Sequence, residues 1–331
     1  MIMIRLEPYT SDFQSQWNEL VTRSKNGTFL LDRRFMDYHS HRFTDCSLLF
    51  FRGSRLVACL PANYVQSEQT VYSHQGLTYG GLIMDDSVGS VEVMQMFSLF
   101  RDYYRNTLGA TRMIYKPTPY IYHRQASEEP LYALFRNDAS LVARGLSTSV
   151  NLSQPIPLQA RRRSGVRKGI EHRLVITETT DRKDYQEFWD VVNTGLQDRH
   201  GVKPVHSVDE MLLLNSRFPN NIRLFVEHDE GGELVAGAWL FITDCVVHVQ
   251  YMATSNPGRQ IGALDYLIAT LIEKRPWMIL PDGQPLKKAP VFFDFGISTE
   301  SSGHNLNEGL IFQKEGFGAR GICYDFWQLP L

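Results

Sequence analysis

The sequence predicts a mixed α/β fold, an α+β arrangement around mixed sheets, that is built from two tandem units. Two observations predict it. The same order of elements occurs twice along the 331 residues, and runs of β-branched and aromatic residues alternate with amphipathic stretches. A segment rich in Pro and Arg, NLSQPIPLQARRRSGVRKG, joins the two halves. We therefore expect one unit over residues 1–150 and a second over 151–331, each long enough for its own core.

The first half begins with helical patterns and continues into a strand meander. The long helix in this half is indicated by Val93, Met96, Phe97 and Phe100, which recur at helical spacing. The expected elements are, in chain order, helices at 13–21 and 29–43, strands within 46–51, 56–65 and 70–84, a helix at 91–110, a strand at 112–122 and a helix at 128–144.

The second half repeats this order. A hairpin turn is predicted at 229–232, and Pro276 ends the helix that follows the meander. The expected elements are helices at 184–200 and 207–218, a strand meander over 221–254, a helix that begins near 263, a buried strand at 291–299, a short helix at 305–315 and a last strand at 319–329. The repeated order indicates a diverged duplication of one unit.

Composition excludes several classes of protein. The apolar fraction of 43% and the charged fraction of 21% are typical of globular proteins, and the net charge of -2 gives no general attraction to nucleic acid or anionic membranes. The sequence shows no membrane-spanning run and no signal-peptide pattern at its start. The four cysteines lack paired spacing, which favours reduced thiols and a cytoplasmic location.

A polar turn before the helix near 263 is suited to an anion. It contains Arg259 but no acid, and the helix dipole adds partial positive charge there. The corresponding turn in the first half carries Asp85, Asp86 and Glu92, which would repel a phosphate. We therefore expect the donor-binding residues in the second half alone: Ser255, Asn256, Gly258, Arg259, Gln260, Gly262 and Ala263. The alternative is an ordinary strand-to-helix loop.

The order strand, glycine turn, amphipathic helix, strand, short helix and strand resembles the GNAT acyltransferase superfamily. In that superfamily an (Arg/Gln)-x-x-Gly-x-(Gly/Ala) turn holds the pyrophosphate of coenzyme A, and Arg259 and Gly262 match its first part. Leu264 departs from the pattern at the last position. The segment NLNEGLIFQKEGFGA is similar to the short helix of the family, with Asn305 at the position of the family Asn. Phe312 stands where the family often has the Tyr that protonates the departing thiolate.

A tandem of two such units with a basic segment before the second resembles the Fem-like branch (FemAB/CelD type) of this superfamily. This resemblance implies an N-acyltransferase that uses acetyl-CoA or another acyl-CoA, needs no metal, and acts on an amine of a cell-envelope precursor or a sugar. One alternative is an aminoacyl-tRNA-dependent peptidyltransferase that acts on a peptidoglycan precursor. Another is a catalytically degenerate module that binds a nucleotide-linked ligand. A pair of strands that separates beside an open pocket at 258–262 would favour coenzyme A, whereas a turn filled by side chains would favour the binding module.

Four further residues are candidates for substrate binding. Arg167 belongs to a basic run that either contacts phosphates or forms a solvated helix face. His200 and His206 flank a Gly/Pro loop of the kind that often lines clefts. Lys314 either neutralises a phosphate or favours a helix C-terminus. The histidines at 39 and 41 lack an accompanying carboxylate or Cys cluster, so no metal site is predicted.

The catalytic candidates are Glu300, Gln250 and His248. Period-2 alternation places His248, Gln250 and Met252 on one face of a strand, where His248 is either a base or a hydrogen-bonded interior residue. Glu300 follows the buried strand at 291–299, at an edge where α/β sheets collect ligands. A carboxylate at that position can accept the proton of an attacking amine, so Glu300 is the predicted base. Its alternative is a solvated loop acid.

Overall fold

The chain forms two compact units. The computed structural model describes residues 3–200 and 205–331, and for 196–200 only the backbone. The first unit runs to Leu146 and includes Thr299–Leu306 and Ile322–Leu331, while the second comprises Ser147–Ser298 and Asn307–Gly321. The C-terminal strand therefore groups with the first unit, although the sequence placed it in the second. The physical reason is its pairing with a strand of the first unit and the burial of Leu329 in that unit's core.

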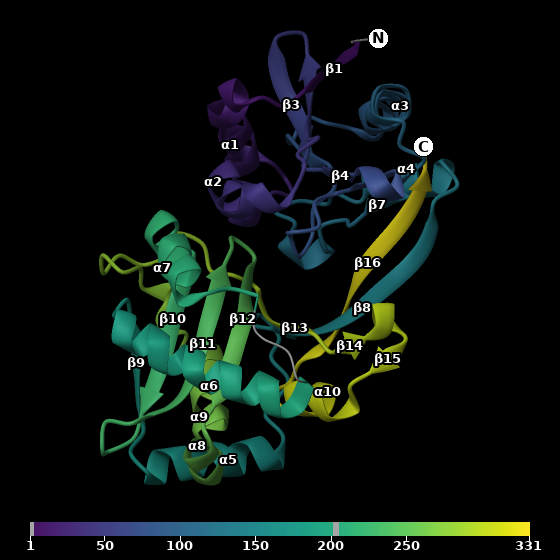
Figure 1. The fold of residues 1–331 in the computed structure, drawn as a ribbon. Helices are drawn as coiled ribbons and strands as arrows, with labels where there is room; N and C mark the ends of the chain where they lie inside the picture. Colours follow the sequence, from purple (N-terminus) through teal and green to yellow (C-terminus); the bar gives the residue numbers. More distant parts are fainter. Residues whose placement is uncertain (1–2, 201–204) are drawn as a thin grey trace. The chain divides into compact units, whose positions relative to one another are not determined.

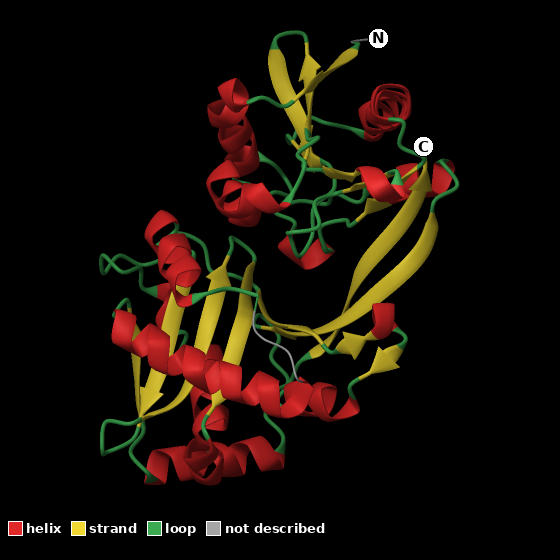
Figure 2. Ribbon diagram, in the orientation of Figure 1, coloured by secondary structure: helices red, strands yellow, loops and turns green. Residues whose placement is uncertain are grey.

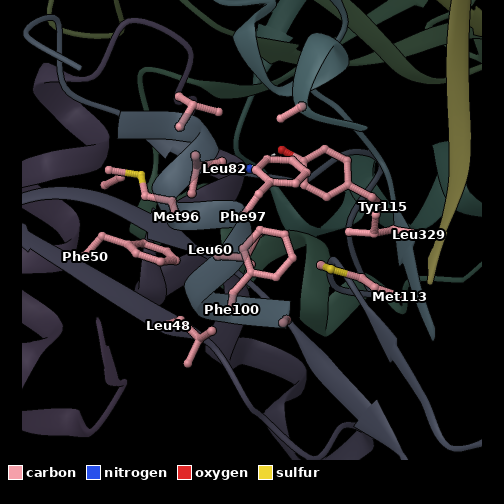
Figure 3. Packing of buried hydrophobic residues seen from close by; sticks show 14 of the residues in the cluster. Leu48, Phe50, Leu60, Leu82, Met96, Phe97, Phe100, Met113, Tyr115 and Leu329 are labelled. Carbon is pink, nitrogen blue, oxygen red and sulfur yellow. Dashed lines mark hydrogen bonds between the residues drawn. The ribbon is translucent and has the colours of Figure 1, made fainter. Parts of the chain in front are cut away.

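The first unit packs helices on antiparallel and mixed strands. Its strands form the orders β1-β2-β3-β6 and β4-β5-β7-β16-β8. Its core is seen in Figure 3, where Phe97 and Phe100 of the long helix meet Leu60 and Tyr115. The elements are β1 (Ile4–Pro8), α1 (Gln14–Arg23), α2 (Arg33–Met36), β2 (Leu48–Arg52), β3 (Arg55–Leu60), β4 (Asn63–Val65), β5 (Thr70–Tyr72), β6 (Ile83–Met84), α3 (Ser90–Leu108), β7 (Arg112–Tyr115), α4 (Glu129–Arg136), β8 (Ser140–Asn151), β14 (Thr299–Glu300), β15 (Asn305–Leu306) and β16 (Arg320–Pro330).

Two expected helices of the first half differ from the structure. The region 29–43 is broken into short turns of helix because the side chain of Asp32 caps a new start at α2. The helix expected over 128–144 ends at Arg136, and the chain reverses through Asp138, whose φ is +57°. The residues after it form β8. A local pattern of apolar residues does not distinguish this strand from a longer helix.

The second unit sandwiches a mixed sheet between helices. The sheet order is β8-β13-β12-β11-β10-β9, and Figure 1 shows α6 crossing strands β9–β12 on one face. On the opposite face, α9 contacts β11 and β12. Figure 2 shows the same view coloured by secondary structure. The elements are α5 (Ala160–Glu171), β9 (Val175–Thr179), α6 (Arg182–His200), α7 (Val208–Arg217), β10 (Ile222–His228), β11 (Leu234–Ile242), β12 (Val246–Thr254), α8 (Asn256–Ile261), α9 (Ala263–Glu273), β13 (Phe292–Ile297) and α10 (Glu308–Glu315).

The basic segment that joins the halves in the sequence is a helix, α5, that packs closely on α9. Gly165 and Gly169 make this approach possible. A Cβ at Gly165 would lie 2.0 Å from an Asp265 carboxylate oxygen, and one at Gly169 would lie 2.5 Å from the Cβ of Tyr266. The G-x-x-x-G spacing therefore places two glycines on one helix face. Within the part of the chain that the structure describes, none of the helices has the length and hydropathy needed to cross a membrane.

Candidate active site

Strands β12 and β13 of the second unit run side by side for a short distance and then separate. They pair in parallel only at Val246–Phe292, Val247–Phe293 and His248–Asp294. Beyond these three pairs no residue of β12 has a β13 partner among the described residues, and β13 continues instead beside β8. The strands thus form a fork at His248. Backbone groups of β12 beyond the fork face a position where a ligand, rather than a neighbouring strand, can bond to them.

A β-bulge at Gln250 changes the faces that the sequence predicted. Trp239 pairs with Tyr251 and the next residue of β11, Leu240, pairs with Val249, which leaves Gln250 as the extra residue. Met252 therefore packs on the apolar core under α9, whereas Tyr251 joins His248 on the α6 face. The alternation is therefore wrong for Met252, because one inserted residue reverses the face of the residues after it, whereas Gln250 stays beside Tyr251 as a hydrogen-bond partner of its hydroxyl.

The turn after β12 is itself a short helix, α8. The side chain of Ser255 caps it by accepting a hydrogen bond from the Gly258 N–H at 3.1 Å, and its carbonyl accepts from the Arg259 N–H. Gly258 is buried against β11, where a Cβ would lie 2.3 Å from the Val235 carbonyl oxygen. Asn256 and Gln260 are exposed. Ser255 and Gly258 therefore hold the turn together, and the next helix, α9, begins directly after Gly262.

A cavity of about 670 Å³ lies beside this turn, wholly within the second unit. Six elements line it: α5, α6, the end of β12, α8, the start of α9, and α10. The lining residues of the turn are Arg259, Gly262 and Ala263, which the sequence predicted, and Leu264 and Asp265 after them. Because β12 leads from the fork at His248 to this turn, the cavity lies along the part of β12 that follows the fork, Tyr251–Thr254, and ends at the start of α9.

The cavity is positively charged at the end near the turn. The exposed side chains of Arg161, Lys168 and Arg259 line it, with the Lys168 ammonium 3.5 Å from the Gln260 carbonyl oxygen. Arg162 and Asp265 also line it and form a salt bridge with each other. Burial raises the pKa of Asp265, and Arg162 opposes this shift. Three cationic groups therefore remain beside one neutralised acid, an arrangement that favours an anionic ligand.

Two side chains of β12, those of His248 and Tyr251, have polar partners from other elements: Asp294 contacts His248, and His206 contacts Tyr251. Asp294 is fully buried and accepts hydrogen bonds from His248 Nδ1 at 2.7 Å and from the Ser147 hydroxyl at 2.6 Å. This contact assigns a proton to Nδ1, so Nε2 of a neutral His248 carries the lone pair. His206 lies near Tyr251, with its Nδ1 3.1 Å from the phenolic oxygen. The sequence could not bring Asp294 and Ser147 to His248, because they come from three different strands.

Lys314 and Phe312 of α10 occupy contrasting positions. The Lys314 ammonium is buried and donates to the carbonyl oxygens of Gly296 and Ile297 and to the Ser298 hydroxyl. These three bonds use all its donors, and burial lowers its pKa to about 8. Lys314 thus ties α10 to the end of β13. Phe312, which is 54% exposed, lines the cavity and offers no acidic hydrogen to it.

The remaining predicted residues are placed as follows. Arg167 is exposed on α5 and is not among the cavity-lining residues of the described chain. Glu300 and Asn305 pair with each other in the β14–β15 hairpin, which groups with the first unit. His200 ends α6, and its side chain lies outside the described residues. A group of potential metal ligands at Asp184, Glu187 and His228 has ligand atoms within 4.8 Å of one another, but none of the three lines the cavity.

Gly262 is expected to be intolerant of a side chain. Its φ is +77°, and a Cβ would lie 2.3 Å from the backbone carbonyl oxygen of Gly165 in α5. We expect Gly262→Ala to lower the free energy of unfolding by about 3 kcal/mol, because left-handed strain and displacement of α5 add together. Urea denaturation measures this. The control is Gly195→Ala, where no heavy atom of the described neighbouring residues lies within 4 Å of the added Cβ and helix propensity favours Ala. Equal stability of the two variants would contradict the close approach.

Comparison with solved structures decides the fold. The chain is similar to FemX over 99% of its own length and 97% of that chain, with a TM-score of 0.65 at 10% sequence identity. It is also similar to a tandem GNAT protein from the clavulanic acid biosynthesis pathway, with a TM-score of 0.52 at 10% identity over 99% and 98% of the two chains. The protein has the Fem-like tandem GNAT fold.

The Fem-like tandem GNAT fold is also shared with the C-terminal domain of a putative lysylphosphatidylglycerol synthetase from Agrobacterium fabrum. That match has a TM-score of 0.57 at 13% identity and covers 96% of this chain and 91% of the other. No family model and no curated protein matches the sequence. The fold class predicted from the sequence, two tandem GNAT-like domains in a mixed α/β arrangement, is confirmed.

Proposed function

We propose that the protein is an N-acyltransferase that takes an acyl group from a coenzyme A thioester. The observation that carries the proposal is the cavity of about 670 Å³ that runs along β12 from Tyr251, three residues beyond its last pair with β13, to the basic turn at α8 and α9. Phosphates would lie against Arg259, Lys168 and Arg161, with the first N–H groups of α9 adding partial positive charge. The pantetheine amides would bond to the strand edge that β13 leaves open.

The acyl acceptor in this proposal is an amine of a cell-envelope precursor or a sugar. The amine nitrogen attacks the thioester carbonyl carbon, and the carbon–sulfur bond breaks. In this proposal N–H groups of β12 beyond the fork donate to the developing oxyanion. Glu300 remains the proposed base and His248 the alternative. In this proposal neither the attack of the amine nor the cleavage of the carbon–sulfur bond uses a metal ion.

Donor placement predicts a specific binding defect. We expect Arg259→Ala to weaken coenzyme A binding by roughly 1–3 kcal/mol, the scale of a lost charge-assisted hydrogen bond. Isothermal titration calorimetry with coenzyme A measures this. The matched control is Lys183→Ala, which removes an exposed cation from α6 on a residue that does not line the cavity. An unchanged affinity of Arg259→Ala for coenzyme A would contradict the binding of the phosphates at this turn.

The same titrations distinguish the alternatives. The wild type can also be tested for aminoacyl-tRNA binding in a filter assay. If it binds aminoacyl-tRNA and no coenzyme A thioester, the acyl donor is the aminoacyl-tRNA. Binding of coenzyme A without transfer to any member of an amine panel would favour the degenerate binding module. The open cavity beside the turn supports a donor site, since a turn filled by side chains leaves no room for one.

A further inference from the structure

A thioester donor leaves a thiolate, which needs a proton, and the short helix α10 does not supply one. The α10 residues that line the cavity are Gly309, Leu310, Phe312 and Gln313, and none has a side chain that dissociates near neutral pH. The proton must therefore come from another wall of the cavity or from water. This question rests on the proposed function, because it concerns the leaving group of that reaction.

Among the described residues that line the cavity, two have side chains that can donate a proton to an alkyl thiolate: Lys168, with its ammonium, and Tyr251, with its phenol. They come from different walls of the cavity, Lys168 from α5 and Tyr251 from β12. Lys168 is beside Gln260 at the basic turn, where the phosphates would lie. Tyr251 is three positions after His248 in β12, close to the fork where the strands separate. The reacting carbon of a donor whose phosphates are held at the turn would lie toward the fork.

The surroundings of Tyr251 hold its ring firmly and give its oxygen several partners. The ring packs edge-on against Trp189, with 5.0 Å between centroids, and lies over Trp239. The bulge at Gln250 is what turns this ring to the α6 face. The hydroxyl has hydrogen-bond partners in the backbone at Val205 and His206, the Gln250 side chain and His206 Nδ1. Burial raises the pKa of Tyr251 and these hydrogen bonds oppose the shift, so the phenol keeps its proton at neutral pH.

We propose that Tyr251 is the general acid that protonates the departing thiolate, in the role that Phe312 cannot fill. With the proton of His206 at Nδ1, the phenolic oxygen accepts from His206 and its own O–H points to the sulfur. As the carbon–sulfur bond breaks, sulfur keeps the bonding pair and takes the phenolic proton. The phenolate is stabilised by the donors around it and regains a proton through His206. The amine has meanwhile lost one proton to the base, so charge and protons balance.

The test compares two thioesters in wild type and Tyr251→Phe. Thiol release is followed with water as the acyl acceptor, so that no amine substrate has to be known. Acetyl-CoA releases a basic alkyl thiolate, whereas S-phenyl thioacetate releases an aryl thiolate that needs no proton to leave. We expect Tyr251→Phe to slow release from acetyl-CoA on the order of 10²-fold, the scale of general acid catalysis, and to affect the aryl thioester little. Its affinity for coenzyme A, measured by calorimetry, is expected to be unchanged.

The control is Tyr266→Phe, which removes a phenol from α9 outside the cavity lining and is expected to match wild type with both thioesters. An equal loss with both thioesters in Tyr251→Phe would assign Tyr251 a packing role and overturn the inference. Wild-type release from acetyl-CoA in that variant would overturn it as well, as would the absence of any thiol release by a wild type that binds coenzyme A. A wild type that binds no coenzyme A overturns the proposed function itself.

Discussion

Replacing Glu227 by Gln is expected to stabilise the protein increasingly as the pH rises from 5 to 9. Glu227 lies on β10 opposite Ala236 and Ile176 and is fully buried. Neither of its carboxyl oxygens has a hydrogen-bond partner among the described residues. Burial raises its pKa from the ordinary 4.5 to about 9, because ionisation in this apolar place has no compensating partner.

The sign follows from proton linkage. Between pH 4.5 and 9 the unfolded chain has lost this proton while the native chain keeps it, so the native state binds more protons. Stability from this group is fully present below the unfolded pKa and is lost as the pH rises through the folded pKa. The total loss is on the order of several kcal/mol, since each unit of pKa shift corresponds to about 1.4 kcal/mol. Gln has the shape of Glu and does not ionise, so the free energy of unfolding of Glu227→Gln does not fall with pH through this group.

Urea denaturation at pH 5, 7 and 9 measures the effect as the difference in free energy of unfolding between Glu227→Gln and wild type. The difference is expected to be small at pH 5 and to reach several kcal/mol at pH 9. Glu230→Gln is the matched control, because Glu230 lies in the adjacent hairpin and its ion pair with Arg173 is exposed. A difference for Glu227→Gln that does not change with pH would contradict an un-ionised carboxyl at this position.

The second large effect concerns the base that takes the proton of the attacking amine. We expect Glu300→Gln to lose on the order of 10²–10⁴-fold in turnover with donor affinity nearly unchanged, because Gln keeps the shape of Glu and cannot accept a proton. Measurement requires an amine acceptor from the panel and rates between pH 6 and 9. Glu300 is exposed in the β14–β15 hairpin, so a charge there carries no burial penalty that a partner would have to offset.

The comparison variant is His248→Gln. His248 has the contacts of an oriented base, with Asp294 holding Nδ1 at 2.7 Å and Ser147 holding Asp294 in turn. Wild-type turnover in Glu300→Gln together with a loss in His248→Gln would transfer the role to His248. An Asp294→Asn variant then separates orientation from basicity, since it is expected to move the pH–rate profile only if His248 is the base.

The sequence alone determined where the long helix of each unit lies and where the polar turn before 263 falls. Helical spacing in 91–110 and the glycine-rich turn before 263 are local patterns, and the structure contains α3 and α9 there. Arg259 and Gly262 were found because their residue types and spacing suit an anion whatever surrounds them. The basic run that contains Gly165 and Gly169 is visible in the sequence, but the sequence does not show that these two glycines pack against α9.

Only the tertiary structure decided which of these residues meet. The fork between β12 and β13, the bulge that turns Tyr251 rather than Met252 to the α6 face, and the contact of His248 with Asp294 depend on pairing between strands far apart in the chain. Lys314 also depends on tertiary structure, because the packing of α10 decides that its ammonium contacts residues 296–298. Strand pairing and helix packing are set by the burial of whole faces, which no single stretch of sequence encodes.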